Sequence, residues 1–398
     1  MGDEANRQVP QARVPDALFV QGSVVLLYAL RHHFAAPAQP PSPAPGLGEI
    51  AIADAESHLV LLAEVEQRIL GEAFHAAERT RRAPVGELIV DGVDGEELKL
   101  QVYLVTHRAG VALFEVWLEA PLAPFDVQVW IDRLRFEREE SLAARAWRAL
   151  GPVAEGLGAQ LDAPELYLPV SVLRAPNDDL DTIIENYGKD LVRLLNLDGS
   201  TTEFKRSYVA QQFGQDFCLR EGGLSLLSRR SAFDLHARGD DAGRASLPLL
   251  VTLELLGLER SVLRLFLAQL TGEPARPLDE LVQLKQDVLD GLEEYYGTLA
   301  TGNTFSAQAT AAGKSLLGLD DLHNSVLSRL DMVSFAVTTR LQKRMNLIGF
   351  WIAVLFGAIE TGLVAGTIAS SHRVAWTVGV ALISVLLISV ILLRFSRA

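Results

Sequence analysis

The sequence predicts an α+β protein in which a mixed α/β domain and a helical segment precede a long stalk helix and two C-terminal transmembrane helices. Residues 347–368 and 374–393 are two apolar runs, and Glu360 is their only ionisable residue. Each run has about 20 residues, the length at which a helix spans a bilayer. Residues 86–118 form three strand-like runs separated by turn residues. No proline or glycine lies between Gly318 and Gly349, so one helix is expected to run from the stalk into the first span.

The composition limits the classes of function and partner. The chain has 398 residues and a net charge of −14. Its acidic excess lies before the apolar runs, so binding along the phosphate backbone of nucleic acid is not expected. Diffuse acidity of this kind solvates a surface, and it also suits cations. The single cysteine, Cys218, rules out a disulfide within the chain and fits a reducing compartment. The first residues lack a basic region followed by an apolar core, so a cleaved signal peptide is not expected.

The first 175 residues divide into an N-terminal segment, 1–48, and an α/β domain, 49–175. Residues 17–30 are apolar but interrupted by Gln21, Gly22 and Ser23, which favours buried strands over a membrane span. A proline-rich linker follows. Turn residues separate the strands of the domain, so an antiparallel meander is expected. The expected elements are a helix over 54–82, strands over 86–90, 98–105 and 111–118, a helix over 124–150 and a strand over 165–173.

Residues 176–314 are expected to form a helical segment. An apolar face recurs along 180–197, and further helices are expected over 247–270 and 277–298. The stretch 247–270 is strongly apolar, but charged residues such as Glu254 and Glu259 interrupt it. It is therefore predicted to be a buried helix rather than a third span. The pair Arg229-Arg230 is either solvated surface or a contact for a phosphate or another acidic ligand.

The stalk helix, 315–346, carries an apolar seam. Apolar residues recur along it every three or four positions, as they do on a helix that packs against partner helices. Together with the first span it forms a helix of about 50 residues, roughly 75 Å long. One chain cannot bury both sides of such a helix, whereas a ring of copies can. We therefore expect the seam to form subunit contacts in a homo-oligomer, and its residues are Leu322, Val326, Leu330, Val333, Val337 and Leu341.

The transmembrane hairpin, 347–398, gathers small and polar residues on one face of its first span. Small residues allow close packing of helices, and the alternative is that this face lines a pore. Glu360 favours the pore, because an ionisable group that faces lipid costs about 2.5 kcal/mol or more. A ring of carboxylates also attracts cations. The candidate pore-lining residues are Asn346, Gly349, Ala353, Gly357, Glu360, Val364 and Thr367.

Basic residues set the expected orientation of the hairpin. The turn 369–373 contains Arg373, whereas five basic residues lie just before the first span and just after the second. The positive-inside rule then places both chain ends in the cytoplasm. We expect a multi-pass protein of the inner (cytoplasmic) membrane with its α/β domain inside the cell. The five flanking residues are Arg340, Lys343, Arg344, Arg394 and Arg397.

This order of parts, from an α/β domain through one long helix to a second span and a short basic tail, resembles the CorA-type magnesium transporter superfamily. The resemblance covers the chain from about residue 50 to its end and rests on architecture. In that family a Gly-Met-Asn triplet closes the first span. Here that end reads Glu360-Thr361-Gly362, and Met345-Asn346 lies at the opposite end of the span. The resemblance implies a pentameric ring with a pathway for divalent cations, and the missing triplet puts magnesium selectivity in question.

Catalytic motifs are absent from the sequence. It has no Walker-type phosphate loop, no His-Glu-x-x-His and no Gly-x-Ser-x-Gly, so no catalytic residue is expected. No cofactor is expected either, apart from a divalent cation, and catalysis by scattered residues is the alternative that motifs do not address. The first hypothesis is a homo-oligomeric cation channel gated by its cytoplasmic domain. The second is a membrane effector or sensor that a small cytoplasmic ligand activates in defence or stress. A structural membrane scaffold is the third.

Overall fold

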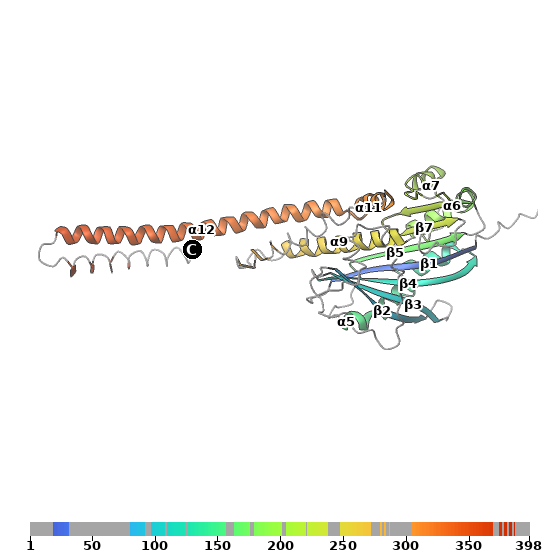
Figure 1. Cartoon of the computed structure of the whole chain (residues 1–398), viewed down its shortest axis with the longest axis horizontal. Coiled ribbons are helices and arrows are strands. Elements are labelled where there is room, and N and C mark those ends of the chain that lie inside the picture. The colour runs from blue at the N-terminus through green and yellow to red at the C-terminus, as the bar shows by residue number, and fades with distance from the viewer. Residues whose placement is uncertain are drawn as a thin grey trace, which may run out of the picture. The chain divides into compact units, whose positions relative to one another are not determined.

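The structure is a computed structural model of the chain (Figure 1). It describes residues 19–31, 80–91, 97–107, 110–124, 126–156, 163–175, 179–200, 204–219, 221–237, 247–271 and 304–368, with a few further positions between 279 and 286 and between 374 and 386. The chain divides into two compact units. The first comprises Met1–Gln269 with Val288–Val326, and the second comprises Leu270–Asp287 with Leu327–Ala398.

One seven-stranded sheet forms the centre of the first unit, in the order β2-β3-β4-β1-β5-β7-β6. Its first four strands along the chain are β1 (Phe19–Arg31), β2 (Thr80–Asp91), β3 (Glu97–His107) and β4 (Val111–Pro124). The strands β2, β3 and β4 pair antiparallel in chain order, which confirms the expected meander. The helix expected over 54–82 is wrong for residues 80–82, which belong to β2, and the rest of this prediction lies outside the described residues.

The strand β1 lies in the middle of the sheet (Figure 1). It pairs antiparallel with β4 on one side and with β5 (Leu166–Ala175) on the other. Its residues from Val24 to Ala29 are at most 1% exposed, which confirms that this apolar run is a buried strand. The pairing with β4 shifts register between Val20 and Gly22, at the interruption that the sequence shows. A bulge of this kind bends the strand locally.

Helices α3 (Val127–Leu134), α4 (Leu142–Ala149) and α6 (Leu180–Asn196) pack on one face of the sheet, and α5 (Gly151–Gly156) follows α4. The single helix expected over 124–150 is wrong, because two helices occupy this stretch. The chain leaves α3 at Arg135 with extended backbone, and Ser141 starts α4 by accepting a hydrogen bond from the Ala144 amide at 3.1 Å. A serine cap of this kind favours a new helix start.

An aromatic cluster fixes α4 to the central strand. The hydroxyl of Tyr28 donates to the carbonyl of Ala143 at 2.7 Å. The ring of Tyr28 lies 5.2 Å from the rings of both Trp147 and Tyr167, measured between centroids. Buried aromatic pairs stabilise a core beyond the area that they bury.

The segment 176–314 is not helical throughout, contrary to expectation. The helix expected over 180–197 is present as α6, and α7 (Arg206–Phe213) follows it. Then come two strands, β6 (Gly223–Leu227) and β7 (Ala232–Ala237), which pair with each other. The strand β7 runs parallel to β5, so the sheet continues across residue 175. Every residue of both strands is buried, and strands buried on both faces lack the alternating pattern that reveals a strand in sequence.

The helix α9 (Leu247–Thr271) packs on the sheet at Gly257. A Cβ atom added at Gly257 would lie 3.0 Å from Leu166 and 3.3 Å from Leu113, so glycine permits a close approach. Apolar residues along α9, such as Leu253 and Leu256, are fully buried. This confirms that 247–270 is a buried helix.

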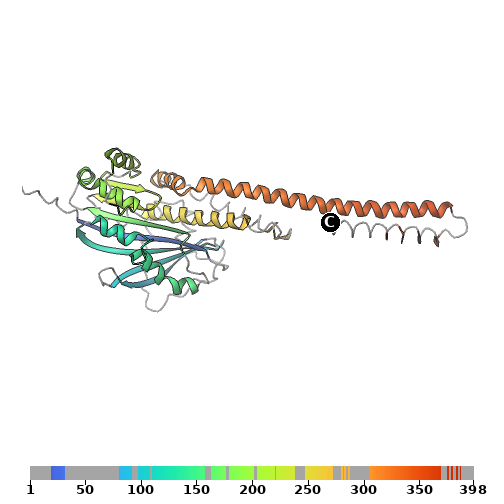
Figure 2. The ribbon, with the colours of Figure 1, turned by 180° about the vertical axis from the view of Figure 1, so that it is seen from behind.

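The helix α11 (Thr304–Leu317) leads into α12 (Leu319–Ile368), a single helix of 50 residues. Figure 2 shows α12 as the long orange helix. The expected run from stalk to span without a break is therefore confirmed. The stalk begins four residues later than expected, because Gly318 adopts a φ of 66°. This left-handed backbone, which glycine adopts at little cost, ends α11.

Several predicted features lie outside the described residues. They include the proline-rich linker and most of the helix expected over 277–298. Most of the second span, 374–393, also lies outside, together with the connecting turn and the basic tail. The orientation of the hairpin and its second crossing therefore remain predictions.

Candidate functional site

In the described part of the chain, α12 is the helix long and apolar enough to cross a membrane, over Leu319–Val364. Large apolar side chains along its second half are exposed, among them Ile348 (58%), Phe356 (65%) and Leu363 (60%). Exposed apolar surface of this extent marks a membrane or a partner interface in a folded protein.

The seven candidate pore-lining residues are all exposed along α12. Gly349 and Gly357 have no atom within 4 Å of an added Cβ. The hydroxyl of Thr367 donates to the carbonyl of Val364 at 2.7 Å, which satisfies this polar group within the helix, as a membrane requires. The structure therefore places the seven residues on one continuous helix, with their side exposed in the single chain.

The six seam residues differ from this pattern. Val326, Leu330 and Val337 are at most 8% exposed, and Leu322 and Val333 are half-buried. Only Leu341 among the six is exposed, at 44%. Most of the seam is thus covered within one chain, so its role in subunit contacts remains a prediction that concerns Leu341 most directly.

Helix geometry relates the two sets of residues. We call the buried residues Val326, Leu330, Val337, Ala358 and Gly362 the covered face. We call the seven candidate pore-lining residues together with Phe335, which is 75% exposed, the open face. Two residues that are nine positions apart are separated by about two and a half turns of an α-helix, so they point to opposite sides. Val326 of the covered face is nine positions from Phe335 of the open face, and Gly362 of the covered face is nine positions from Ala353 of the open face. The two faces therefore lie on opposite sides of α12.

A buried carboxylate lies where α9 meets the start of α12. Glu259 of α9 is 5% exposed, and its Oε2 atom has no hydrogen-bond partner among the described residues. Burial raises the pKa of Glu259 to about 7, against the lowering effect of Lys314 and with a further rise from Asp320. Burial also lowers the pKa of His323 on α12, and Lys314 lowers it further. The sequence showed Glu259 only as an interruption of an apolar run.

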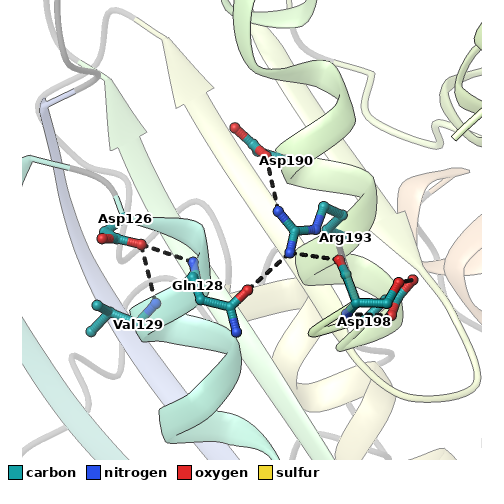
Figure 3. Close-up of polar contacts among 7 residues, drawn as sticks. Asp126, Gln128, Val129, Asp190, Arg193 and Asp198 are labelled. Atoms are coloured by element: carbon teal, nitrogen blue, oxygen red, sulfur yellow. Dashed lines mark hydrogen bonds and ion pairs between the residues drawn. The ribbon is translucent and has the colours of Figure 1, made fainter. Parts of the chain in front are cut away.

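A second polar cluster joins α3 to the end of α6, and Figure 3 shows it around Arg193. The Nη2 atom of Arg193 donates to Gln128 Oε1 and to the Ser200 carbonyl, both at 2.9 Å. Its Nη1 atom lies 3.7 Å from Asp190. Figure 3 also shows Asp126 at the start of α3, where its carboxylate accepts from the Gln128 amide at 2.9 Å. These contacts hold two helices and a loop together.

The pair Arg229-Arg230 lies in the turn between β6 and β7, and Arg230 influences Asp198 in the loop after α6. The amide of Ser200 donates to Asp198 at 2.9 Å, and this bond lowers the pKa of Asp198, with smaller effects from Arg193 and Arg230. Arg229 and Arg230 are both exposed. Contact of this pair with a phosphate or another acidic ligand remains a prediction.

A third cluster lies between β6 and β7. Asp234 is 1% exposed, accepts a hydrogen bond from the Ser225 hydroxyl at 2.5 Å and lies 2.9 Å from the Nε2 atom of His236. The carboxylate thus separates the serine from the histidine. Nucleophilic catalysis by serine requires the hydroxyl to donate to the imidazole, so these contacts are not those of a catalytic triad.

Among the described residues, no group of three or more His, Cys, Asp or Glu side chains could hold a metal ion. Sequence reasoning grouped the seven small and polar residues of the open face, and it missed Phe335, the buried carboxylate and the strand cluster. Comparison with known proteins adds no relative: no family model matches the chain, and no curated protein or solved structure does.

Proposed function

We propose that the protein is a homo-oligomeric membrane channel for cations, CorA-like in architecture and gated by its cytoplasmic domain. The observation that supports this proposal best is the division of α12 into a covered face and an open face. A single unbroken helix carries small and polar residues along an exposed side through its apolar half. In lipid such a side needs a water-filled cavity or a partner.

The covered face changes the expected arrangement of subunits. In the proposed ring, α12 packs on its own chain through Val326, Leu330 and Val337, which are buried without a second copy. The open face then turns toward the ring axis. Phe335 and the exposed seam residue Leu341 supply apolar surface for contacts between neighbouring subunits. A pentamer follows from the family resemblance alone.

Glu360 has the central role in the proposed pathway. It lies on the open face about two turns before the end of α12. In a ring its carboxylate would repeat once per subunit, and a ring of carboxylates concentrates cations and repels anions. Asn346 would lie near the other end of the pathway and Thr367 near its mouth.

Ion flux into liposomes tests the proposal. Purified full-length protein should admit K⁺ or Mg²⁺ in preference to Cl⁻, and Glu360→Gln should reduce this preference while leaving the oligomer intact. Thr361→Val is the matched control, because Thr361 is the next residue along α12 and its hydroxyl already donates to the Gly357 carbonyl. Equal flux through wild type and Glu360→Gln would remove Glu360 from the pathway. A monomeric mass across several detergents would refute the ring.

The second candidate function is a membrane effector that a cytoplasmic ligand opens. The observation that favours it is the sequence Glu360-Thr361-Gly362, which stands where a magnesium-selective relative would have its Gly-Met-Asn triplet. The same liposomes separate the two candidates. Flux without additions supports the first, and flux only after addition of small molecules extracted from cells supports the second.

A further inference from the structure

The buried carboxylate of Glu259 has no function in the proposed pathway and no hydrogen-bond partner among the described residues. It lies on α9 and is 5% exposed, and the charged groups that influence it lie on α11 and in the first turn of α12. All of these parts belong to the first compact unit. An ionised carboxylate in such a position is costly, and buried charges are normally paired or neutralised.

Close packing of α11 on α9 places the neighbours of Glu259. A Cβ atom added at Gly313 would lie 2.3 Å from Leu256 Cδ1, so a larger residue would require the Leu256 side chain to shift. Glu259 follows Leu256 by three residues, which puts both on one side of α9, and Lys314 directly follows Gly313. Beyond the crossing, Leu317 and Leu319 are 7% and 1% exposed, so both ends of the junction are inserted in the core.

Two charged groups face the carboxylate from the helices packed against it. Lys314 of α11 attracts its ionised form, and Asp320 in the first turn of α12 repels it. On α9 itself, the next residue is Arg260, whose guanidinium is influenced by Arg264 and Glu165 instead. Lys314 and Asp320 also influence the pKa of His323 on α12. Lys314 has the larger of the two charge effects, so burial, more than Asp320, makes the ionised form of Glu259 unfavourable in the packed junction.

The junction has a joint at which α12 can move. Gly318 has a φ of 66° and no atom within 4 Å of an added Cβ. Its amide donates to the Ser315 carbonyl at 3.3 Å, and its carbonyl accepts from the Leu322 amide at 3.1 Å. A glycine in left-handed backbone with free space around it can change its dihedral angles at low cost.

We propose that Glu259 is a proton-binding residue that switches this junction: the protonated acid tolerates burial in the packed junction, and the ionised carboxylate favours a released junction in which water reaches it. A buried carboxyl group becomes hydrated when its covering helix moves away, and it then regains an ordinary pKa. The packed state has a pKa of about 7 for Glu259, so the balance would respond to pH near neutrality. The response does not depend on whether α12 conducts ions.

Linkage gives the sign and the size of the effect. A carboxyl group with a raised pKa in the packed state favours packing at low pH and loses this contribution as pH rises toward that pKa. For values of 4.5 released and about 7 packed, the ratio of released to packed junction increases about tenfold between pH 6 and pH 8. His323 has the opposite dependence, because its lowered pKa favours packing at high pH.

Hydrogen exchange of the full-length protein in detergent tests the switch. The amides of residues 319–326 should lose about tenfold of their protection between pH 6 and pH 8, relative to Glu259→Gln at each pH. The ratio to this variant cancels the intrinsic pH dependence of exchange and the contribution of His323. Asp321→Asn is the matched control, because Asp321 is an exposed acid in the same first turn of α12, and it should keep the wild-type response.

Two further variants test the electrostatics even if Glu259→Gln folds poorly. The wild-type protection stops falling near the pKa of Glu259 in the packed state. Asp320→Asn should lower the pH at which protection stops falling, because it removes a charge that repels the ionised carboxylate. Lys314→Met should raise that pH, because it removes a charge that attracts the ionised carboxylate. Equal protection in wild type and Glu259→Gln at both pH values would refute the switch. So would a shift of the same sign in Asp320→Asn and Lys314→Met. The hydrogen-exchange result does not depend on the flux assay, so the switch can hold even if Glu360→Gln conducts ions like wild type.

Discussion

Truncation of one side chain on each face of α12 distinguishes packing within a chain from packing between chains. Leu330 is 5% exposed and Phe335 is 75% exposed in the single chain. Leu330→Ala removes three buried heavy atoms and leaves a cavity, so it should lower the free energy of unfolding by about 2–5 kcal/mol. Phe335→Ala removes side-chain atoms that one chain leaves in solvent, so it should change the stability of a single chain by less than about 0.5 kcal/mol.

The two variants should also differ in oligomeric mass. If Phe335 contacts a neighbouring subunit, Phe335→Ala should weaken the oligomer, seen as smaller species on dilution in detergent. Leu330→Ala should lower the melting temperature at every protein concentration, including concentrations at which wild type is dissociated. Equal melting temperatures for wild type and Leu330→Ala would refute the assignment of Leu330 to the covered face. A loss of single-chain stability in Phe335→Ala as large as that in Leu330→Ala would refute the two-face description.

Three further predictions concern the first unit and its junction. Glu259→Gln should raise the free energy of unfolding by up to about 3 kcal/mol at pH 8 and leave it unchanged near pH 4, because the raised pKa of about 7 destabilises the ionised protein; chemical unfolding at both pH values measures this, and an equal effect at both would contradict it. Gly318→Ala should lower the free energy of unfolding by about 1–2 kcal/mol, because alanine is strained in the left-handed backbone of Gly318. Gly349→Ala, in the open helix, should raise the free energy of unfolding by up to about 1 kcal/mol. Equal shifts of the melting temperature in the two variants would argue against strain at Gly318. Ser141→Ala should lower the free energy of unfolding by about 1 kcal/mol, because α4 loses its N-terminal cap. Ser141→Asp keeps a capping side chain, so its melting temperature should match that of wild type.

The sequence predicted the parts of the fold in which periodicity and turn residues agree. The meander of β2, β3 and β4 was predictable because turn residues separate apolar runs of strand length. The 50-residue α12 was predictable because no proline or glycine lies between Gly318 and Gly349. The strands β6 and β7 were missed because they are short and buried on both faces, so neither length nor alternation identifies them. The break between α3 and α4 was missed because residues 135–141 contain no proline or glycine, and the cap at Ser141 marks the new helix start.

The candidate site shows the same division. The open face of α12 is a property of spacing along one helix, so the sequence contains it in full. The position of Glu259 depends on how three helices meet, and its neighbours Lys314 and Asp320 are more than 50 residues away along the chain. A single sequence contains no signal for such a meeting. The seam along α12 was predictable as an apolar side, but spacing does not reveal what covers it, so its role in subunit contacts stays a prediction.

The strand order has a consequence for the order in which the protein can fold during synthesis. The central strand β1 leaves the ribosome before every other described strand, yet its two partners are completed only when the chain has reached Pro124 and Ala175. Until then its fully apolar stretch, Val24 to Ala29, has no native partner. Unpaired strands of this kind aggregate readily. Nascent chains stalled before residue 124 should therefore need a chaperone to stay soluble, whereas chains stalled after the completion of β5 should hold β1 between two neighbours.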